Sequence, residues 1–232
     1  MKKILLIPTY NEAENIRAIV EAVLKYTPDM HILILEDNSP DGTGAIADEL
    51  ASEHQDVRVE HRAAKMGLGS AYVAGFKRAI AEDYDYICHM DADFSHDPKY
   101  WPDLLAGMQD NDVMIGSRYV SGGGTQNWGL HRRILSRTSN FIARTLLGLK
   151  VRDCTGGFRC YKSETLKKID PGKIKSNGYS FLEEVLYKAA KSGAKIGETP
   201  IIFVERRLGQ SKISKKEIFK AVATLFRLRF GK

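Results

Sequence analysis

Short apolar runs that alternate with helical patterns are the feature that most limits how this chain of 232 residues can fold. The runs cover residues 3–8, 31–35, 57–61, 86–90 and 113–116, and helix-like periods separate the first four. Runs of this kind are typical of strands buried on both faces, and helices between them are typical of the crossovers that connect parallel strands. The pattern therefore predicts an α/β fold, an open sheet of parallel strands flanked by helices.

The first helix has a recognisable start. Asn11 is placed to act as its N-cap, and Glu14, three residues later, is placed as the capping-box partner. The apolar face of this helix is formed by Ile16, Ile19, Val20 and Val23. Further helical periods are predicted at residues 45–50, 70–80, 101–108, 134–147, 181–191 and 215–229.

The composition indicates one compact domain, because no linker, low-complexity tract or repeat divides the chain. We expect a domain over residues 1–212 and a C-terminal extension over residues 213–232. Three cysteines without CxxC spacing favour a reducing compartment and argue against structural zinc. The N-terminal apolar run ends at Pro8, too early for a signal peptide, and no run approaches the ~18 to 20 apolar residues that cross a bilayer. We therefore expect a cytoplasmic protein that touches a membrane only from its surface.

Polar segments follow several of the predicted strands, at residues 8–12, 36–42 and 91–93. Ligands bind at the carboxyl ends of strands in open α/β sheets. Asp91 and Asp93 suit a divalent cation, which takes one or two carboxylates and leaves its other positions to water and substrate phosphates. The alternative is a solvated turn, because Asp is common in turns. An acid at each of three successive strand ends favours the site.

The charge balance favours anionic partners. The chain has 35 Lys and Arg against 29 Asp and Glu, a net charge of +6. Phosphates, anionic lipids and nucleic acids are all compatible with this excess. An NAD-dependent oxidoreductase is disfavoured, because Pro8, Thr9 and Tyr10 follow the first strand where such enzymes carry GxGxxG.

Ordered motifs carry a resemblance to a known family. They are residues 8–12 (PTYNE), 37–43 (DNSPDGT), 65–69 (KMGLG), 91–93 (DAD), 116–119 (GSRY) and 153–159 (DCTGGFR). Together they resemble the family 2 glycosyltransferases. Within that family, residues 178–181 (GYSF) and 203–212 (FVERRLGQSK) resemble the dolichol-phosphate mannose synthases, and the resemblance spans residues 4 to about 212.

The resemblance implies a GT-A fold that binds a nucleotide sugar over the first strands, with Mg²⁺ or Mn²⁺ as cofactor. It implies inverting transfer of mannose from GDP-mannose to a polyprenyl (dolichyl-type) phosphate. UDP-glucose or another nucleotide sugar is the alternative donor. The alternative from a different class is a non-enzymatic basic module that binds membranes or nucleic acid, whereas the leading interpretation expects no nucleic acid.

The resemblance also implies roles for individual residues. The nucleoside pocket would be formed by Pro8, Tyr10, Glu12, Leu35 and Asp37. The diphosphate would lie beside Asp91, Ala92 and Asp93. Asp93 would bind the metal directly and Asp91 would face the ribose or the metal's water shell. Ser95 stands where family members often carry Gln, and it would bind the metal or only its water.

The acceptor phosphate is already an anion, so it needs cations rather than a general base. The resemblance places Arg118, Arg132, Arg133, Ser136, Arg206 and Lys212 around it, and arginine's fork suits phosphate oxygens. The residues expected to act in catalysis are Asp91, Asp93 and Arg118.

The remaining ionisable residues near these motifs receive structural roles. His89 is expected in the core, and His96 is expected to support the acids rather than to bind metal, because Mg²⁺ and Mn²⁺ prefer oxygen ligands. Glu183 and Glu184 lie where hydroxyl-accepting relatives place a base, and here they are expected to complement a helix dipole.

The C-terminal segment has an amphipathic pattern. Its apolar face would comprise Ile218, Phe219, Val222, Ala223, Leu225, Phe226 and Phe230, with basic residues around it. It fits either a helix lying on a membrane surface or a terminal helix packed on the sheet, and residues 132–147 raise the same choice. The leading interpretation places the protein on the cytoplasmic face of a membrane, where a small membrane subunit is a possible partner.

Overall fold

The computed structural model describes residues 1–178, 180–205 and 215–231, with side chains in the last segment from residue 222 onward. Within these residues a seven-stranded sheet has the order β3-β2-β1-β4-β7-β5-β8. Its strands are β1 (Lys3–Thr9), β2 (Met30–Glu36), β3 (Val57–His61), β4 (Tyr86–His89), β5 (Val113–Ser117), β7 (Arg159–Lys162) and β8 (Ile196–Pro200). A smaller sheet pairs β6 (Gly124–Gln126) with β9 (Ile202–Val204).

The predicted strands are confirmed, but the sheet is not wholly parallel. β1 pairs in parallel with both β2 and β4, so the carboxyl ends of these three strands share one edge. β7 runs antiparallel between β4 and β5. The apolar-run criterion missed β7 because it is short and begins with a charged residue, Arg159, which is nevertheless fully buried.

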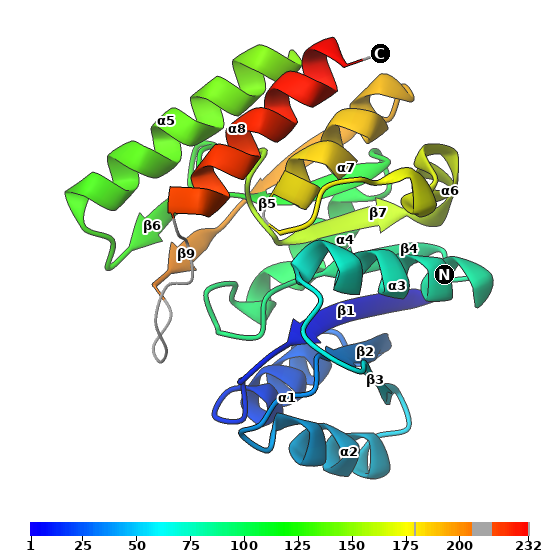
Figure 1. Ribbon diagram of the computed structural model, residues 1–232. Helices are drawn as coiled ribbons and strands as arrows, with labels where there is room; N and C mark the ends of the chain where they lie inside the picture. The colour runs from blue at the N-terminus through cyan, green and yellow to red at the C-terminus, as the bar shows by residue number, and fades with distance from the viewer. Residues whose placement is uncertain (179, 206–214, 232) are drawn as a thin grey trace.

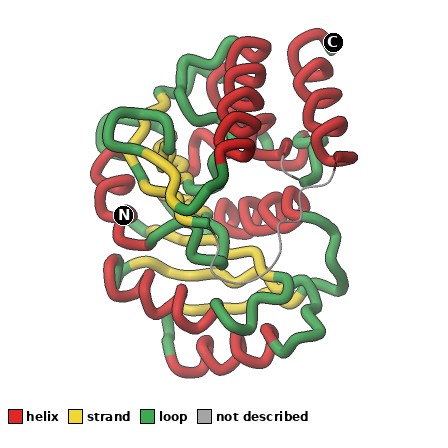
Figure 2. Tube along the Cα trace, turned by 90° about the vertical axis from the view of Figure 1, so that its left-hand side faces the viewer, coloured by secondary structure: helices red, strands yellow, loops and turns green. Residues whose placement is uncertain are grey.

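Helices cover both faces of the large sheet (Figures 1 and 2). They are α1 (Ile16–Tyr26), α2 (Thr43–Glu53), α3 (Leu68–Ala81), α4 (Trp101–Gly107), α5 (Leu130–Leu147), α6 (Ser163–Ile169), α7 (Ser180–Lys191) and α8 (Lys215–Phe230), with short 3₁₀ turns at Pro98–Tyr100 and Pro171–Lys173. α5 and α8 lie side by side at the end of the molecule farthest from α1 and α2 (Figure 1).

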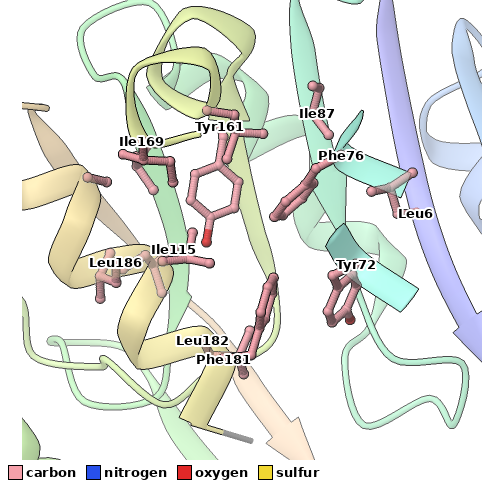
Figure 3. Packing of buried hydrophobic residues seen from close by; sticks show 14 of the residues in the cluster. Leu6, Tyr72, Phe76, Ile87, Ile115, Tyr161, Ile169, Phe181, Leu182 and Leu186 are labelled. Carbon is pink, nitrogen blue, oxygen red and sulfur yellow. The ribbon is translucent and has the colours of Figure 1, made fainter. Parts of the chain in front are cut away.

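The core has two parts, one on each face of the sheet, because successive strand residues point to opposite faces. Leu6 of β1 belongs to the cluster under α3 and α7, whereas its neighbours Leu5 and Ile7 belong to the cluster under α1 and α4. Aromatic rings fill the first cluster, where the centroids of Tyr72 and Phe181 are 5.5 Å apart (Figure 3). The fold therefore positions the strand ends with packing on both sides.

His89 confirms its predicted place in the core. It is fully buried, its Nδ1 lies 2.8 Å from the carbonyl oxygen of Gly157, and its ring centroid is 4.4 Å from that of Tyr72.

The predicted start of the first helix is wrong. α1 begins at Ile16, and Asn11 adopts a left-handed conformation with φ 58°. A turn separates the two, in which the carbonyl oxygen of Glu12 accepts hydrogen bonds from the amides of Asn15 and Ile16. The predicted apolar face is confirmed, because all four of its residues are buried.

Candidate active site

Unusual backbone conformations mark three strand ends at one edge of the sheet. Asn11 after β1, Asn38 after β2 and Phe94 after β4 have φ values of 58°, 56° and 58°. Asn tolerates this left-handed region, but a side chain such as Phe is strained there. Strain of this kind concentrates at functional sites, so the three loops together are candidates for one.

The first two of these loops are tied together by side chains of the 37–43 motif. Ser39 Oγ accepts a hydrogen bond from the amide of Asn11 at 3.2 Å, and Thr43 Oγ1 accepts one from the amide of Glu12 at 2.9 Å. Asp41 Oδ1 in turn accepts from the Thr43 hydroxyl at 2.6 Å. The motif therefore holds the loop that carries the predicted nucleoside residues.

Those residues lie together at this edge. Pro8, Tyr10 and Glu12 are half-buried. The ammonium group of Lys65 lies 3.9 Å from the centre of the Tyr10 ring, so a cation already covers the face predicted to stack on a base. Lys65, in the 65–69 motif, therefore lies beside the predicted nucleoside pocket.

Asp37 and Leu35, the other predicted pocket residues, are placed differently. Asp37 is buried and accepts a hydrogen bond from Arg62 Nη1 at 2.6 Å. Burial raises the pKa of Asp37 above its usual value, and the charge of Arg62 opposes that shift. Leu35 is fully buried and packs toward Gly75 of α3, so its side chain lies in the core.

Sequence reasoning missed Arg62. The signal available was a basic residue directly after the third strand, at the edge where the other strand ends carry acids. Its guanidinium also donates to Ser70 Oγ, which ties Asp37 to the start of α3.

The acidic pair follows β4 as predicted. Asp93 is 6% exposed, and its Oδ1 accepts a hydrogen bond from the amide of Ser95 at 3.1 Å. The side chain of Asp91 is 39% exposed and lies against the backbone of Gly157. Ala92 between them is buried in the core. One carboxylate is therefore held by the loop, while the other reaches further toward solvent.

The oxygens near this pair fit a hard divalent cation. The hydroxyl of Ser95 is buried and has no hydrogen-bond partner in the part of the chain that the structure describes. Among residues 1–178, 180–205 and 215–231, no three His, Cys, Asp or Glu side chains form a complete metal-binding group. A cation here would therefore be held by Asp91, Asp93 and the hydroxyl or water at Ser95, with substrate phosphates completing its shell.

His96 lies between the acids and an aromatic wall. Its Nδ1 is 3.8 Å from Asp91 Oδ2, and its ring stacks on Phe158 with centroids 5.3 Å apart. Burial lowers the pKa of His96 to about 4, although the charge of Asp93 raises it. His96 is thus neutral at pH 7, and this position fits the supporting role expected for it.

Arg118 is clamped by a residue that sequence reasoning left without a role, Asp153. Arg118 Nε and Nη2 donate to the two carboxylate oxygens of Asp153 at 2.7 and 2.8 Å, and Nη2 also donates to Thr155 Oγ1 at 2.7 Å. Both partners are buried, and although burial raises the pKa of Asp153, Arg118 brings it below its usual value. Arg118 Nη1 donates no hydrogen bond within the described residues, so the clamp fixes the guanidinium through Nε and Nη2 alone.

The donor and acceptor halves of the predicted site meet at His96. The ring centroid of His96 is 5.1 Å from that of Phe203, and the guanidinium carbon of Arg118 is 5.5 Å from the same ring. Asp91 contacts the other side of His96. The structure therefore brings the acidic pair and Arg118 together at one edge of the sheet.

Other predicted acceptor residues line α5. Arg132 forms an ion pair with Glu205, and its guanidinium carbon lies 4.3 Å from the Trp128 ring centre. Ser136 Oγ is 2.7 Å from the hydroxyl of Tyr119. Arg133 is exposed and lines a small cavity with Arg118. The predicted residues Arg206 and Lys212 lie outside the described residues.

Glu183 and Glu184 are both in the first turns of α7. Glu184 accepts hydrogen bonds from the amides of Lys175 and Ser176 and forms an ion pair with Arg227 of α8 at 3.1 Å. Glu184 therefore joins three segments. Burial raises the pKa of Glu183 to about 7.

Comparison with known proteins identifies the family. The family model described as glycosyl transferase family 2 matches residues 4–170. The chain is 45% identical over 223 residues to the polyprenol monophosphomannose synthase of Mycolicibacterium smegmatis, covering 95% of this chain and 84% of that protein. It is 41% identical over 227 residues to the undecaprenyl-phosphate mannosyltransferase of Micrococcus luteus, covering 98% and 93%.

Solved structures support the same fold. Glucosyl-3-phosphoglycerate synthase from Mycobacterium tuberculosis, in complex with Mn²⁺, UDP and glucosyl-3-phosphoglycerate, superimposes with a TM-score of 0.70 at 18% identity, covering 98% of this chain and 80% of that one. The predicted fold class is confirmed: a mostly parallel sheet flanked by helices, as in GT-A enzymes. The chain belongs to glycosyl transferase family 2 and is a glycosyltransferase.

Proposed function

We propose that the protein transfers mannose, with inversion, from GDP-mannose to the phosphate of a polyprenol. The observation that carries this proposal is the meeting of Asp91 and Asp93 with the clamped Arg118 around His96. It puts carboxylates suited to a nucleotide-bound cation beside a fixed guanidinium suited to an anionic acceptor. The names of the two relatives above support mannose as the sugar and a polyprenyl phosphate as the acceptor.

The donor would bind across the first loops. Tyr10 and Asp37 would contact the nucleoside, and Asp91, Asp93 and Ser95 would hold Mg²⁺ or Mn²⁺ against the diphosphate. When bound, such a cation neutralises charge that develops on the departing diphosphate.

In the reaction, a phosphate oxygen of the acceptor forms a bond to the anomeric carbon as the bond from that carbon to GDP breaks. GDP leaves, and the configuration at the anomeric carbon is inverted. The second pKa of a phosphate monoester is about 6, so the acceptor is already an anion at neutral pH and needs no general base. Arg118 Nη1, Arg132 and Ser136 would hold it in line.

The acceptor's lipid tail requires a membrane surface nearby. α5 exposes Leu130, Ile134, Leu135, Phe141 and Ile142, and α8 exposes Val222, Phe226 and Phe230. None of the described helices is both long and apolar enough to pass through a bilayer. We propose that this surface, called the α5–α8 surface below, lies on the cytoplasmic leaflet, with the segment 213–232 as its C-terminal part and a small membrane subunit as a possible partner. Whether α8 is amphipathic stays a prediction, because Leu225 is buried and residues 218 and 219 have no described side chains.

The reaction is tested by measuring transfer of radiolabelled sugar with purified protein. GDP-mannose, UDP-glucose and UDP-GlcNAc are offered with Mn²⁺, Mg²⁺ or EDTA, and the acceptor is a polyprenyl phosphate or the matching polyprenol. We expect metal-dependent transfer from GDP-mannose to the phosphate alone. Transfer from a UDP-sugar only would refute GDP-mannose as the donor. Equal transfer to the polyprenol would refute the phosphate as the accepting group.

A conservative variant tests the role of Arg118. Arg118→Lys keeps the charge but cannot span both oxygens of Asp153, so we expect the KM for polyprenyl phosphate to rise about tenfold or more while the KM for GDP-mannose is unchanged. Arg78→Lys, which alters an arginine of α3 paired with Glu60 and Glu82, is the control. Equal effects of the two variants would contradict the assignment.

A further inference from the structure

A second group of arginines lines a cavity beside the proposed acceptor site. The cavity, of about 400 Å³, lies between α5, the segment 118–123 and residue 152. Its walls include Arg137 and Arg144 of α5 and Arg152, with Arg118 and Tyr119 on one side. The proposed transfer reaction uses none of these three additional arginines.

The wall that carries Arg152 is held in place by α5. Asn140, a buried residue between Arg137 and Arg144 on the helix, donates to the carbonyl oxygen of Arg152 and accepts from the amide of Cys154 at 2.9 Å. Glu198 accepts from the Arg152 amide at 2.7 Å. The backbone that carries Arg152 is therefore fixed by three hydrogen bonds.

The three guanidinium groups are not neutralised within the described residues. None of Arg137, Arg144 and Arg152 forms an ion pair or donates a side-chain hydrogen bond to residues 1–178, 180–205 or 222–231, and Arg144 Nε is buried without a partner. Arg118 differs, because its charge is matched by Asp153. The Arg144 Nε donor is buried without a partner, which is unfavourable, and Arg137 and Arg152 are exposed beside it, so this cavity suits an anionic ligand.

Arg118 borders this cavity as well as the proposed acceptor site, but Arg144 lies too far along α5 to share a phosphate group with Arg132. Arg132 and Arg144 are twelve residues apart, which is about 18 Å along a helix. A single phosphate group spans only a fraction of that length. An anion held by Arg144 and Arg152 is therefore distinct from a phosphate group held by Arg132 and Ser136.

The position of the cavity indicates where that ligand comes from. Phe141, which lines the cavity, is 64% exposed and belongs to the α5–α8 surface together with Ile142. A headgroup at the level of this surface would reach the arginines while its acyl chains stay in the bilayer. Arginine forks match phosphate oxygens, and basic residues attract anionic lipids.

We propose that Arg137, Arg144 and Arg152 form a site for a phosphate group, supplied by an anionic membrane phospholipid. The site goes beyond the transfer reaction and rests only on the proposed membrane-facing surface. Soluble phosphate shares the same chemistry, so the two sources are separated experimentally.

The test uses the full chain and two probes, with no nucleotide sugar in either arm. In the first arm, sedimentation measures binding to vesicles of phosphatidylcholine alone or with about 20% phosphatidylglycerol. In the second, inorganic phosphate is compared with chloride at equal ionic strength for its effect on the melting temperature. Failure of either arm leaves the transferase proposal untouched.

The variant removes three charges, as Arg137→Gln, Arg144→Gln and Arg152→Gln together. The control removes the same number from exposed positions on α1, α6 and α7, as Lys25→Gln, Lys168→Gln and Lys191→Gln. Each basic residue near an anionic surface changes partitioning by roughly fivefold, so we expect about 100-fold weaker binding of the arginine variant to the anionic vesicles. Binding of the control variant to the anionic vesicles should change by less than about threefold, because none of its three substitutions is on α5 or α8.

A third protein, with the three arginines changed to lysine, separates a built site from diffuse attraction and covers the case that the Gln variant does not fold. We expect it to bind anionic vesicles at least about fivefold more weakly than the parent, because lysine lacks the fork. Stabilisation by inorganic phosphate that needs the arginines, without a vesicle effect, would support the site but assign it to soluble phosphate. Equal behaviour of the arginine and control variants in both arms, or full binding by the lysine protein, would overturn the proposal.

Discussion

Glu183 provides a test of the electrostatics of the buried region around Arg159 and Cys154. It is 8% exposed on α7, and its Oε2 is buried without a hydrogen-bond partner in the described part of the chain. Burial raises its pKa from 4.5 to about 7, and the charge of Arg159 opposes that shift only in part. Because the folded pKa is the higher one, this group's stability contribution is complete below pH 4.5 and is lost as the pH rises toward 7.

The size of the effect follows from that shift. Each pKa unit corresponds to about 1.4 kcal/mol, so the raised pKa lowers the free energy of unfolding by about 3 kcal/mol at pH 8, where Glu183 is ionised in the folded protein, and by about 1 kcal/mol at pH 5, where it is protonated in the folded protein and largely ionised in the unfolded chain. Glu183→Gln keeps the shape and removes the charge. The increase in the free energy of unfolding of the variant over the parent should be about 2 kcal/mol larger at pH 8 than at pH 5.

The assay is urea unfolding followed by the fluorescence of Trp101 and Trp128 at both pH values. A difference of about 2 kcal/mol corresponds to a shift of the urea midpoint by roughly 1 M. Glu21→Gln, which removes an exposed carboxylate of α1, is the control, and we expect its midpoint difference between the two pH values to match the parent. If Glu183→Gln also follows the parent at both pH values, the inferred burial of an ionisable carboxyl at this position is wrong.

Further substitutions probe the packing and the site. Asp153→Asn leaves the buried charge of Arg118 without its partner, so urea unfolding should show a loss of about 3 kcal/mol or more. Gly69→Ala would put a Cβ 2.8 Å from a backbone carbonyl oxygen, and we expect a loss of about 1–3 kcal/mol, whereas Gly44→Ala, whose nearest contact would be 3.5 Å, is the control with a smaller loss. Ser95→Ala should raise the Mn²⁺ concentration for half-maximal transfer by about tenfold while the melting temperature stays unchanged, and an unaltered metal requirement would remove Ser95 from the metal's surroundings.

The parts of the fold that follow from local pattern were predictable from the sequence. All five apolar runs form strands, of which four are largely buried and one, β3, is a half-buried edge strand. The apolar spacing that begins at Ile16 correctly predicted the buried face of α1. The sequence did not predict β7 because contacts with distant residues stabilise it. The guanidinium of Arg159 can be buried because it donates to the carbonyl oxygens of Gly156, Cys154 and Leu182. No local pattern indicates that these carbonyl groups will converge.

Some site residues were predictable from the sequence and others were not. The acids after β4 could be placed at the sheet edge because strand ends in such folds meet there. The residues that hold Asp37 and Arg118 could not be predicted, because Arg62 and Asp153 bind partners that are 25 and 35 residues away in the sequence. Leu35 shows the opposite limit, since the family resemblance implied a place in the nucleoside pocket, whereas its side chain lies in the core.

We propose that Asp93 acts in sugar transfer at the carboxyl end of β4. It is tested most directly by comparing Asp93→Asn with Asp97→Asn in Mn²⁺-dependent transfer from GDP-mannose to polyprenyl phosphate. Asp97 caps the following 3₁₀ turn by accepting from the Lys99 amide at 3.0 Å, and Asn preserves such a cap. We predict that Asp93→Asn lowers kcat/KM for GDP-mannose by about 100-fold or more, with an unchanged melting temperature, and that Asp97→Asn stays within about threefold of the parent. Equal activity of the two variants would contradict the account.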